Sequence, residues 1–289
     1  MADIKIAGIM RAGAYSPNHI GNDALIFNIV ADQLRKRGCE VAVYSEEQLA
    51  AGAVREDIIV NMCREERSIE LLQRREDQGA LVINSGYGIE NCVRERMTRI
   101  LLGNNIPYPQ SLVVNTNESI KAELEKAGFG PCWIKRADSR DRHKEDVSYV
   151  RHVGEAQEML QEYFLRGIKR AVVTRHLEGD LIKFYGIAGT KFFYWFYPFQ
   201  GHRNGRRTEA DRVDEQSLSF DQEQMRAMCE QAADVLGVAI YGGSCIVSTE
   251  GQPSIIDFND WPSFAPCRAE AGPQIARAIL SMIKAYKKQ

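Results

Sequence analysis

Residues 255–262 read Ile-Ile-Asp-Phe-Asn-Asp-Trp-Pro, and this apolar run with interleaved polar residues predicts a β-strand that ends in a turn. Side chains on a strand alternate between its two faces, so Asp257 and Asn259 share one face. Ile256 and Phe258 are then expected to point the other way, into a core. A carboxylate and an amide at this spacing suit Mg²⁺, which usually takes one or two carboxylates together with substrate phosphates. A strand that simply runs out into a polar turn is the alternative interpretation.

Upstream of this strand, two segments combine an extended pattern with cations. Lys135 ends the apolar run Cys132-Trp-Ile-Lys, where a long ammonium side chain can reach a phosphate group. Residues 174–180 read Thr-Arg-His-Leu-Glu-Gly-Asp, and extended backbone next to a glycine turn can face an adenine edge. Asp180 is then placed for a ribose hydroxyl, and Lys183 for a phosphate. Taken singly, each segment has a plainer explanation, namely a solvated lysine and a strand–turn–strand.

The first hundred residues alternate short apolar strands with amphipathic helices. Strands are expected at 4–10, 41–44, 58–60 and 81–83, and helices at 23–37, 68–78 and 91–103. This order indicates a parallel, doubly wound sheet, in which ligands bind beyond the carboxyl ends of the strands. The polar loop 11–22 is expected there, and its candidates for substrate contact are Arg11, Ser16, Asn18 and His19. Ordinary turn chemistry, with Asn22 as a helix cap, explains the same loop equally well.

Three parts of the chain differ in pattern. Pro107 and Pro109 break the helix before them and mark the first boundary. The next segment alternates strand, helix, two strands, helix and strand, which suggests a small α+β subdomain. Beyond it lie aromatic strands, a hairpin turn at 188–191 and a polar loop at 201–217. A helix that Asp221 and Gln224 begin as a capping-box-like start is expected next, and a last helix at about 274–287. We therefore expect an N-terminal α/β domain (1–105), a central subdomain (106–174) and a C-terminal α+β subdomain with a mostly antiparallel sheet (175–289).

The composition, 44% hydrophobic and 26% charged, is that of a soluble globular protein. The net charge of -2 gives no electrostatic basis for binding nucleic acid or an anionic membrane. No apolar run approaches the roughly 20 residues that span a bilayer, and the N-terminus lacks a signal-peptide pattern. The 7 cysteines form no Cys-x-x-Cys pair, which favours reduced thiols in a cytoplasmic protein.

The order and spacing of these pieces resemble the ATP-grasp superfamily over nearly the whole chain, and in particular carboxylate–amine ligases of the ribosomal-protein glutamate ligase type. The matches fall on a phosphate-binding cation, a second such cation, the adenine segment with the turn after it, and the metal strand. The first phosphate-binding cation is Arg96 and the second is Lys135. The adenine segment is Arg175-His176-Leu177, and Asp180 with Lys183 belongs to the turn after it. The metal strand carries Asp257 and Asn259. At the first of these positions the family usually has a lysine.

This resemblance implies an ATP-dependent ligase that uses Mg²⁺. In such families ATP phosphorylates a carboxylate and an amine attacks the acyl phosphate, so the substrates would be a small-molecule or peptide carboxylate and an amine. Lys135, Lys183 and Arg96 would offset charge on the transferred phosphoryl group. Arg268 would pair with a substrate carboxylate, or is a plain surface arginine. An arginine-rich loop would close on an acidic substrate, or is a solvated surface loop; its arginines include Arg203, Arg206 and Arg207. Neither nucleic acid nor a membrane is expected as a partner. Whether the protein forms a homodimer is left open by the sequence.

Two further departures from the family pattern keep other functions open. The loop 137–146 contains no glycine, although the family's loop is glycine-rich so that its backbone closes over phosphates. Ser244 and Cys245 stand where a second metal-binding carboxylate is expected. A small-molecule kinase that phosphorylates a hydroxyl, as in ATP-grasp inositol phosphate kinases, and a nucleotide-binding pseudo-enzyme are therefore alternatives to the ligase.

Overall fold

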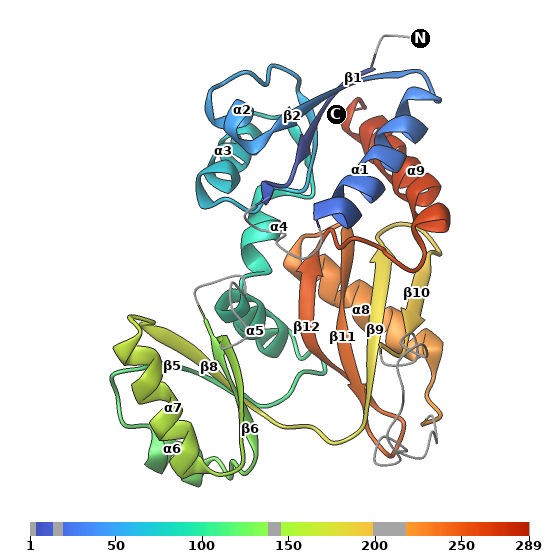
Figure 1. Cartoon of the computed structure of the whole chain (residues 1–289). Coiled ribbons are helices and arrows are strands. Elements are labelled where there is room, and N and C mark those ends of the chain that lie inside the picture. Colours follow the sequence, from blue (N-terminus) through green and yellow to red (C-terminus); the bar gives the residue numbers. More distant parts are fainter. Residues whose placement is uncertain (1–3, 14–19, 138–145, 199–217, 289) are drawn as a thin grey trace.

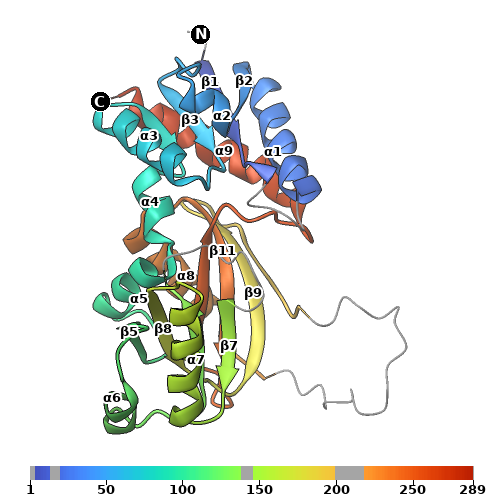
Figure 2. The ribbon, with the colours of Figure 1, turned by 60° about the vertical axis from the view of Figure 1, so that its left-hand side comes forward.

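The structure is a computed structural model that describes residues 4–13, 20–137, 146–198 and 218–288. The described strands form three four-stranded sheets, which follow one another along the chain (Figure 1). Figure 2 shows the first sheet and its helices at one end of the molecule and the other two sheets at the opposite end. Within these residues, no helix is long and apolar enough to cross a membrane.

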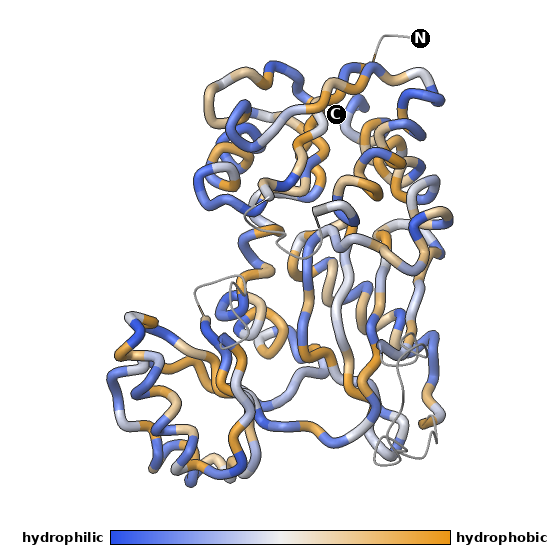
Figure 3. The backbone as a smooth tube through the Cα atoms, in the orientation of Figure 1, coloured by the Kyte–Doolittle hydropathy of each residue, from blue (hydrophilic) through white to orange (hydrophobic). Residues whose placement is uncertain are grey.

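The N-terminal sheet is parallel, with strand order β2-β1-β3-β4, and is covered on both faces. Its elements are β1 (Ile4–Met10), α1 (Ile20–Arg35), β2 (Cys39–Ser45), α2 (Glu46–Ala50), β3 (Ile58–Asn61), α3 (Glu66–Asp77) and β4 (Leu81–Ile83). Ile6 packs with α1 and the C-terminal helix α9 (Arg268–Tyr286), whereas Ala7 packs with α2 and α3. The predicted doubly wound parallel sheet is confirmed. Figure 3 shows polar and apolar positions intermixed along α1 and α9, as expected for helices that bury one side.

The central sheet is antiparallel, with order β5-β8-β6-β7. Its elements are β5 (Ser111–Asn115), α6 (Lys121–Lys126), β6 (Cys132–Arg136), β7 (Val147–Val150), α7 (Val153–Leu165) and β8 (Arg170–Arg175). This is the predicted strand–helix–strand–strand–helix–strand order. Cys132 and Ile134 of β6 pack under α6 and α7, so Trp133 and Lys135 lie on the opposite face.

The C-terminal sheet is antiparallel, with order β10-β9-β11-β12. Its elements are β9 (Asp180–Ile187), β10 (Phe193–Phe196), α8 (Gln222–Leu236), β11 (Ile240–Val247) and β12 (Pro253–Asp260). Alternate residues such as Phe184, Cys245 and Phe258 pack under α8, which leaves the opposite face for polar residues. Asp221 accepts hydrogen bonds from the N–H groups of Glu223 and Gln224 and so caps α8 as predicted.

Two helix predictions were wrong in their bounds. The helix expected at 91–103 is two helices, α4 (Gly86–Asn91) and α5 (Arg94–Gly103). The last helix, expected to begin near Gln274, begins at Arg268 and contains Pro273. The proline removes one N–H donor, but Ala271, Gly272 and Ile275 around it are buried, and this packing outweighs the loss. The predicted domain bounds stay a prediction, and α9 at the end of the chain packs against α1 of the N-terminal part.

Asn84, directly after β4, fixes the N-terminal sheet to the C-terminal sheet. Its side chain is buried, and its Nδ2 donates to the carbonyl of Ile240 at 2.7 Å. Its Oδ1 accepts from the N–H groups of Ala239 and Ile240, both at 2.9 Å. These three bonds hold the start of β11, the neighbour of β12, at a defined place relative to β4.

Gly88 of α4 is a second contact at this junction. A Cβ at Gly88 would lie 2.1 Å from the carbonyl oxygen of Gly237, at the end of α8. We expect Gly88→Ala to lower the free energy of unfolding by about 1–3 kcal/mol, because the backbone must shift to admit the methyl group. Gly103→Ala is the matched control, since nothing lies within 4 Å of its added Cβ. It should be neutral or stabilise α5 by up to about 1 kcal/mol. Urea unfolding measures both, and equal effects would contradict this packing.

Candidate active site

Asp257 and Asn259 share the face of the C-terminal sheet that is opposite α8. Asn259 Nδ2 lies 3.0 Å from Asp257 Oδ2, and both side chains are half-buried. Asp257 pairs with Ser244 on β11, which pairs with Lys183 on β9. Because paired residues of antiparallel strands point to the same face, these side chains form one row across the sheet.

Ile256 does not face the core as predicted, because β12 contains a bulge. Ser244 pairs with Asp257 while Cys245 pairs with Ile255, which leaves Ile256 as the extra residue. Ile255 and Phe258 fill the core instead, and both are fully buried. The bulge thus aims two oxygen side chains at one face and turns the carbonyl of Ile256 toward the central sheet.

Lys135 joins the two sheets. It is 9% exposed, and its Nζ donates to the carbonyl of Ile256 at 3.2 Å. The predicted phosphate lysine and the predicted metal strand therefore meet, although 121 residues separate them in the chain. Lys183 is exposed and lies two strands from Asp257, which corresponds to about 10 Å between backbones.

Arg96 of α5 is exposed and has an ion-pair partner on α4. Its side chain is 54% exposed and its Nη2 is 2.8 Å from Glu90 of α4. Arg94, to which no role was assigned from the sequence, is buried, and its Nη1 donates to the carbonyl of Arg136 at 2.9 Å. Arg94 thus lies directly beside the end of β6 that carries Lys135. Its helical spacing with the apolar Met97 and Leu101 is the signal that would have found it.

Tyr108 lies close to the charges of both Asp257 and Arg94. Burial raises the pKa of Tyr108 to about 12, and a hydrogen bond with Thr98 acts against this. The charge of Asp257 raises the same pKa and that of Arg94 lowers it, so both charges are near the phenol. Arg94 and Asp257 therefore belong to one electrostatic environment.

The predicted adenine segment leads out of β8 toward β9, and its side chains have partners. Arg175 Nη2 donates to the carbonyls of Ala127 and Gly128, at 3.1 and 2.8 Å. Trp133 Nε1 donates to His176 Nδ1 at 3.1 Å. Leu177 is half-buried beside them, and Asp180 accepts a hydrogen bond from the N–H of Leu218 at 2.9 Å. Arg175 and Asp180 thus have structural contacts, and backbone groups remain as the adenine-binding candidates in this segment.

Arg11 also has structural contacts. Its guanidinium pairs with Asp23 at 2.7 Å and donates to the carbonyls of Trp261 at 3.0 Å and Met62 at 3.2 Å. Burial lowers its pKa, and the charge of Arg64 adds to this effect. Arg11 therefore connects the N-terminal sheet to the turn after β12. Ser16, Asn18, His19, Arg203, Arg206 and Arg207, the remaining predicted substrate contacts, lie outside the described residues.

Backbone donors at the strand ends of the N-terminal sheet are occupied as well. The carboxylate of Glu46, which is 1% exposed, accepts from the N–H groups of Ala12, Arg64 and Glu65 at 2.9–3.2 Å. These donors are therefore not available to an anionic ligand.

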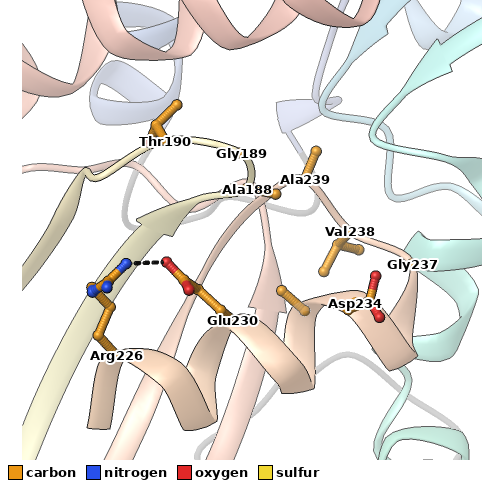
Figure 4. A pocket seen from close by; sticks show the side chains of 10 residues that line it. Ala188, Gly189, Thr190, Arg226, Glu230, Asp234, Gly237, Val238 and Ala239 are labelled. Carbon is orange, nitrogen blue, oxygen red and sulfur yellow. Dashed lines mark hydrogen bonds and ion pairs between the residues drawn. The ribbon is translucent and has the colours of Figure 1, made fainter. Parts of the chain in front are cut away.

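A cavity of about 440 Å³ lies on the α8 side of the C-terminal sheet (Figure 4). The hairpin 188–190 and α8 line it, and Arg226 pairs there with Glu230 at 2.6 Å. None of the predicted site residues lines it, so it is separate from the junction that carries Lys135 and Asp257.

Comparison with known proteins finds no matching family model and no matching curated protein. Solved structures are similar over almost the full length. D-alanine–D-alanine ligase from Bacillus anthracis has a TM-score of 0.70 at 16% identity, with 99% of both chains covered. A RimK domain protein ATP-grasp from Sphaerobacter thermophilus has a TM-score of 0.67 at 16% identity, covering 96% of this chain and 99% of its own. The ATP-grasp ligase PsnB, complexed with minimal precursor, Mg and ADP, has a TM-score of 0.64 at 16% identity, covering 97% and 98%. The chain therefore has the ATP-grasp fold.

Proposed function

We propose that this protein is an ATP-dependent ligase that joins a carboxylate to an amine. The position of Lys135 carries the proposal, because its ammonium bonds to the carbonyl of Ile256 next to Asp257 and Asn259. A cation from one sheet and oxygen ligands from the other meet at one place, as phosphoryl transfer requires. The ligases that share the fold support this reaction class by analogy.

The proposed reaction has two displacements. An oxygen of the substrate carboxylate attacks the γ-phosphorus of ATP, and the bond from that phosphorus to the bridging oxygen breaks to release ADP. The amine then attacks the acyl carbon, phosphate leaves, and the nitrogen loses a proton. Neither step requires a nucleophilic side chain. Lys135, Lys183 and Arg94 would offset the negative charge on the phosphoryl group from fixed positions.

Asp257 and Asn259 would hold Mg²⁺. Carboxylate and amide oxygens are hard donors of the kind that this ion takes together with phosphates. Turning the amide of Asn259 over would place its oxygen, in place of its nitrogen, beside Asp257 Oδ2. Bound there, the ion would neutralise phosphate charge. Ser244 occupies the position opposite Asp257, on the strand where a second carboxylate was expected, which favours a single ion.

ADP release against a panel of carboxylates and amines tests the function. A ligase requires one member of each class for steady turnover. Turnover with a single hydroxyl compound would identify the small-molecule kinase instead. Binding of Mg-ATP without turnover over the whole panel would favour the pseudo-enzyme.

Arg94 and Arg96 provide a matched pair of substitutions two residues apart. We expect Arg94→Met to weaken binding of a non-hydrolysable ATP analogue by at least about 10-fold, because one charged contact is worth about 1.5–3 kcal/mol. Arg96→Met should change it less than about 2-fold, because its side chain is exposed and paired with Glu90. Calorimetric titration measures both affinities. The reverse order would show that Arg96 contacts phosphate, as the sequence resemblance implies.

A further inference from the structure

Aromatic side chains of β9 and β10 lie on the same face of the C-terminal sheet as the side chains of Asp257 and Asn259 on β12. Tyr185 pairs with Gly242, which pairs with Asn259 on β12. On the other side Tyr185 pairs with Tyr194 of β10. Phe196, two residues further along β10, points to the same face. We call Tyr185, Tyr194 and Phe196 the aromatic shelf.

The shelf is one continuous surface. The ring centroids of Tyr185 and Tyr194 are 6.5 Å apart, those of Tyr185 and Phe196 5.7 Å, and those of Tyr194 and Phe196 5.9 Å. All three side chains are half-buried, whereas Phe184 and Phe258 on the opposite face are fully buried under α8. The shelf thus combines ordered packing with accessible ring surface.

Gly242 brings the shelf up to the metal ligands. A Cβ at Gly242 would lie 2.7 Å from Cδ1 of Tyr185 and 2.8 Å from Cγ of Pro262. The tyrosine ring therefore lies over Gly242, in the space that any other residue would fill. Because Gly242 is the direct neighbour of Asn259, this ring reaches to within about one strand spacing, roughly 5 Å, of the proposed metal site.

Arg268 lies at the edge of the shelf nearest the N-terminal part. Phe264 packs on Tyr185 with ring centroids 5.0 Å apart, and Arg268 Nε donates to the carbonyl of the preceding Ser263 at 3.2 Å. The charge of Arg268 lowers the pKa of Tyr185, against a larger rise that is caused by burial, so the guanidinium is close to the phenol. Its Nη2 donates to Asn22 Oδ1, whereas its Nη1 has no partner among the described residues.

We propose that the aromatic shelf and Arg268 form a substrate subsite for a small molecule that carries a carboxylate and an aromatic or large apolar side chain, such as an aromatic amino acid. Arg268 binds the carboxylate, and the side chain of the substrate packs on the aromatic shelf. This subsite lies next to the place where phosphoryl transfer would occur. This inference rests on the proposed ligase function for its chemistry, but the binding it predicts can be measured alone.

The test measures binding of phenylalanine (both enantiomers), alanine and 2-phenylethylamine by calorimetry, with and without Mg²⁺ and a non-hydrolysable ATP analogue. Phenylalanine should bind at least about 10-fold more tightly than alanine, because the ring is removed from water. Tyr194→Ala should abolish that preference. Tyr197→Ala is the matched control, since Tyr197 packs on the α8 side with Trp195, and it should keep the preference.

Arg268→Met should weaken the binding of phenylalanine at least about 10-fold. It should leave the affinity for 2-phenylethylamine, which lacks the carboxylate, unchanged. Equal binding of phenylalanine and alanine, no binding of either, or equal effects of the two tyrosine substitutions would overturn the subsite. Absence of nucleotide binding would instead overturn the proposed function, and the arm without nucleotide would still decide the subsite.

Discussion

Lys135→Ala is expected to lower the rate of ADP release by about 100- to 1000-fold, the usual loss when one preorganised donor to a transition state is removed. Lys135 is 9% exposed as a residue and its ammonium donates to the carbonyl of Ile256, so little of its charge is screened by water. The measurement is a coupled assay of ADP release with whichever substrates the panel yields.

Two further variants keep this result interpretable. Lys135→Met retains most of the aliphatic stem and separates loss of charge from loss of packing. Lys169→Ala removes an exposed lysine of the same subdomain and should leave the rate unchanged. Full activity in Lys135→Ala, with the fold intact, would remove Lys135 from the mechanism.

Asp260→Ala is expected to lower the free energy of unfolding by about 3–5 kcal/mol, because it leaves a buried cation without its partner. Asp260 is fully buried, and its Oδ1 lies 2.8 Å from Nη2 of Arg64, whose side chain is 14% exposed. Arg64 Nη2 also donates to the backbone carbonyl of Asp260 at 3.0 Å. Neither carboxylate oxygen has a hydrogen bond of good geometry among the described residues, so the attraction is that of an ion pair.

Denaturant unfolding measures this loss of stability, and two further variants serve as comparisons. Removing Arg64 as well, in Arg64→Met/Asp260→Ala, should recover part of the stability. Asp57→Ala removes an exposed carboxylate paired with Arg75 and should change stability by less than about 0.5 kcal/mol. Equal losses for Asp260→Ala and Asp57→Ala would show that burial of the pair has no energetic consequence.

The sequence predicts the fold because its signals are local. Alternation of strands and helices at the start, and the strand order of the central subdomain, follow from hydrophobic periodicity within each element. The family resemblance assigned Lys135 and Asp257 to one Mg-ATP site, and the structure brings Lys135 to the carbonyl of Ile256 beside Asp257. The roles of both residues stay predictions.

The rest depends on contacts between elements. The bulge that turns Ile256 out of the core depends on the register between β11 and β12. The sequence of β12 alone does not determine this register. The choice between Arg94 and Arg96 depends on which side of α5 docks on the central sheet. Arg11 follows a strand end, as a ligand-binding residue would, but its donors are taken by Asp23, Met62 and Trp261, which are distant in the chain or unmarked by any motif.

Binding of a non-hydrolysable ATP analogue tests the central claim most directly, with thermal stability followed in the presence and absence of Mg²⁺ for the wild-type protein and Asp257→Ala. Ligand at about 100 times its dissociation constant adds roughly 2.7 kcal/mol to the native state. For a chain of this size that raises the melting temperature by about 5–10 °C. We predict a Mg²⁺-dependent rise in the wild-type protein that Asp257→Ala abolishes. A folded wild-type protein with no rise would contradict the nucleotide site, and an equal rise in Asp257→Ala would contradict its metal strand.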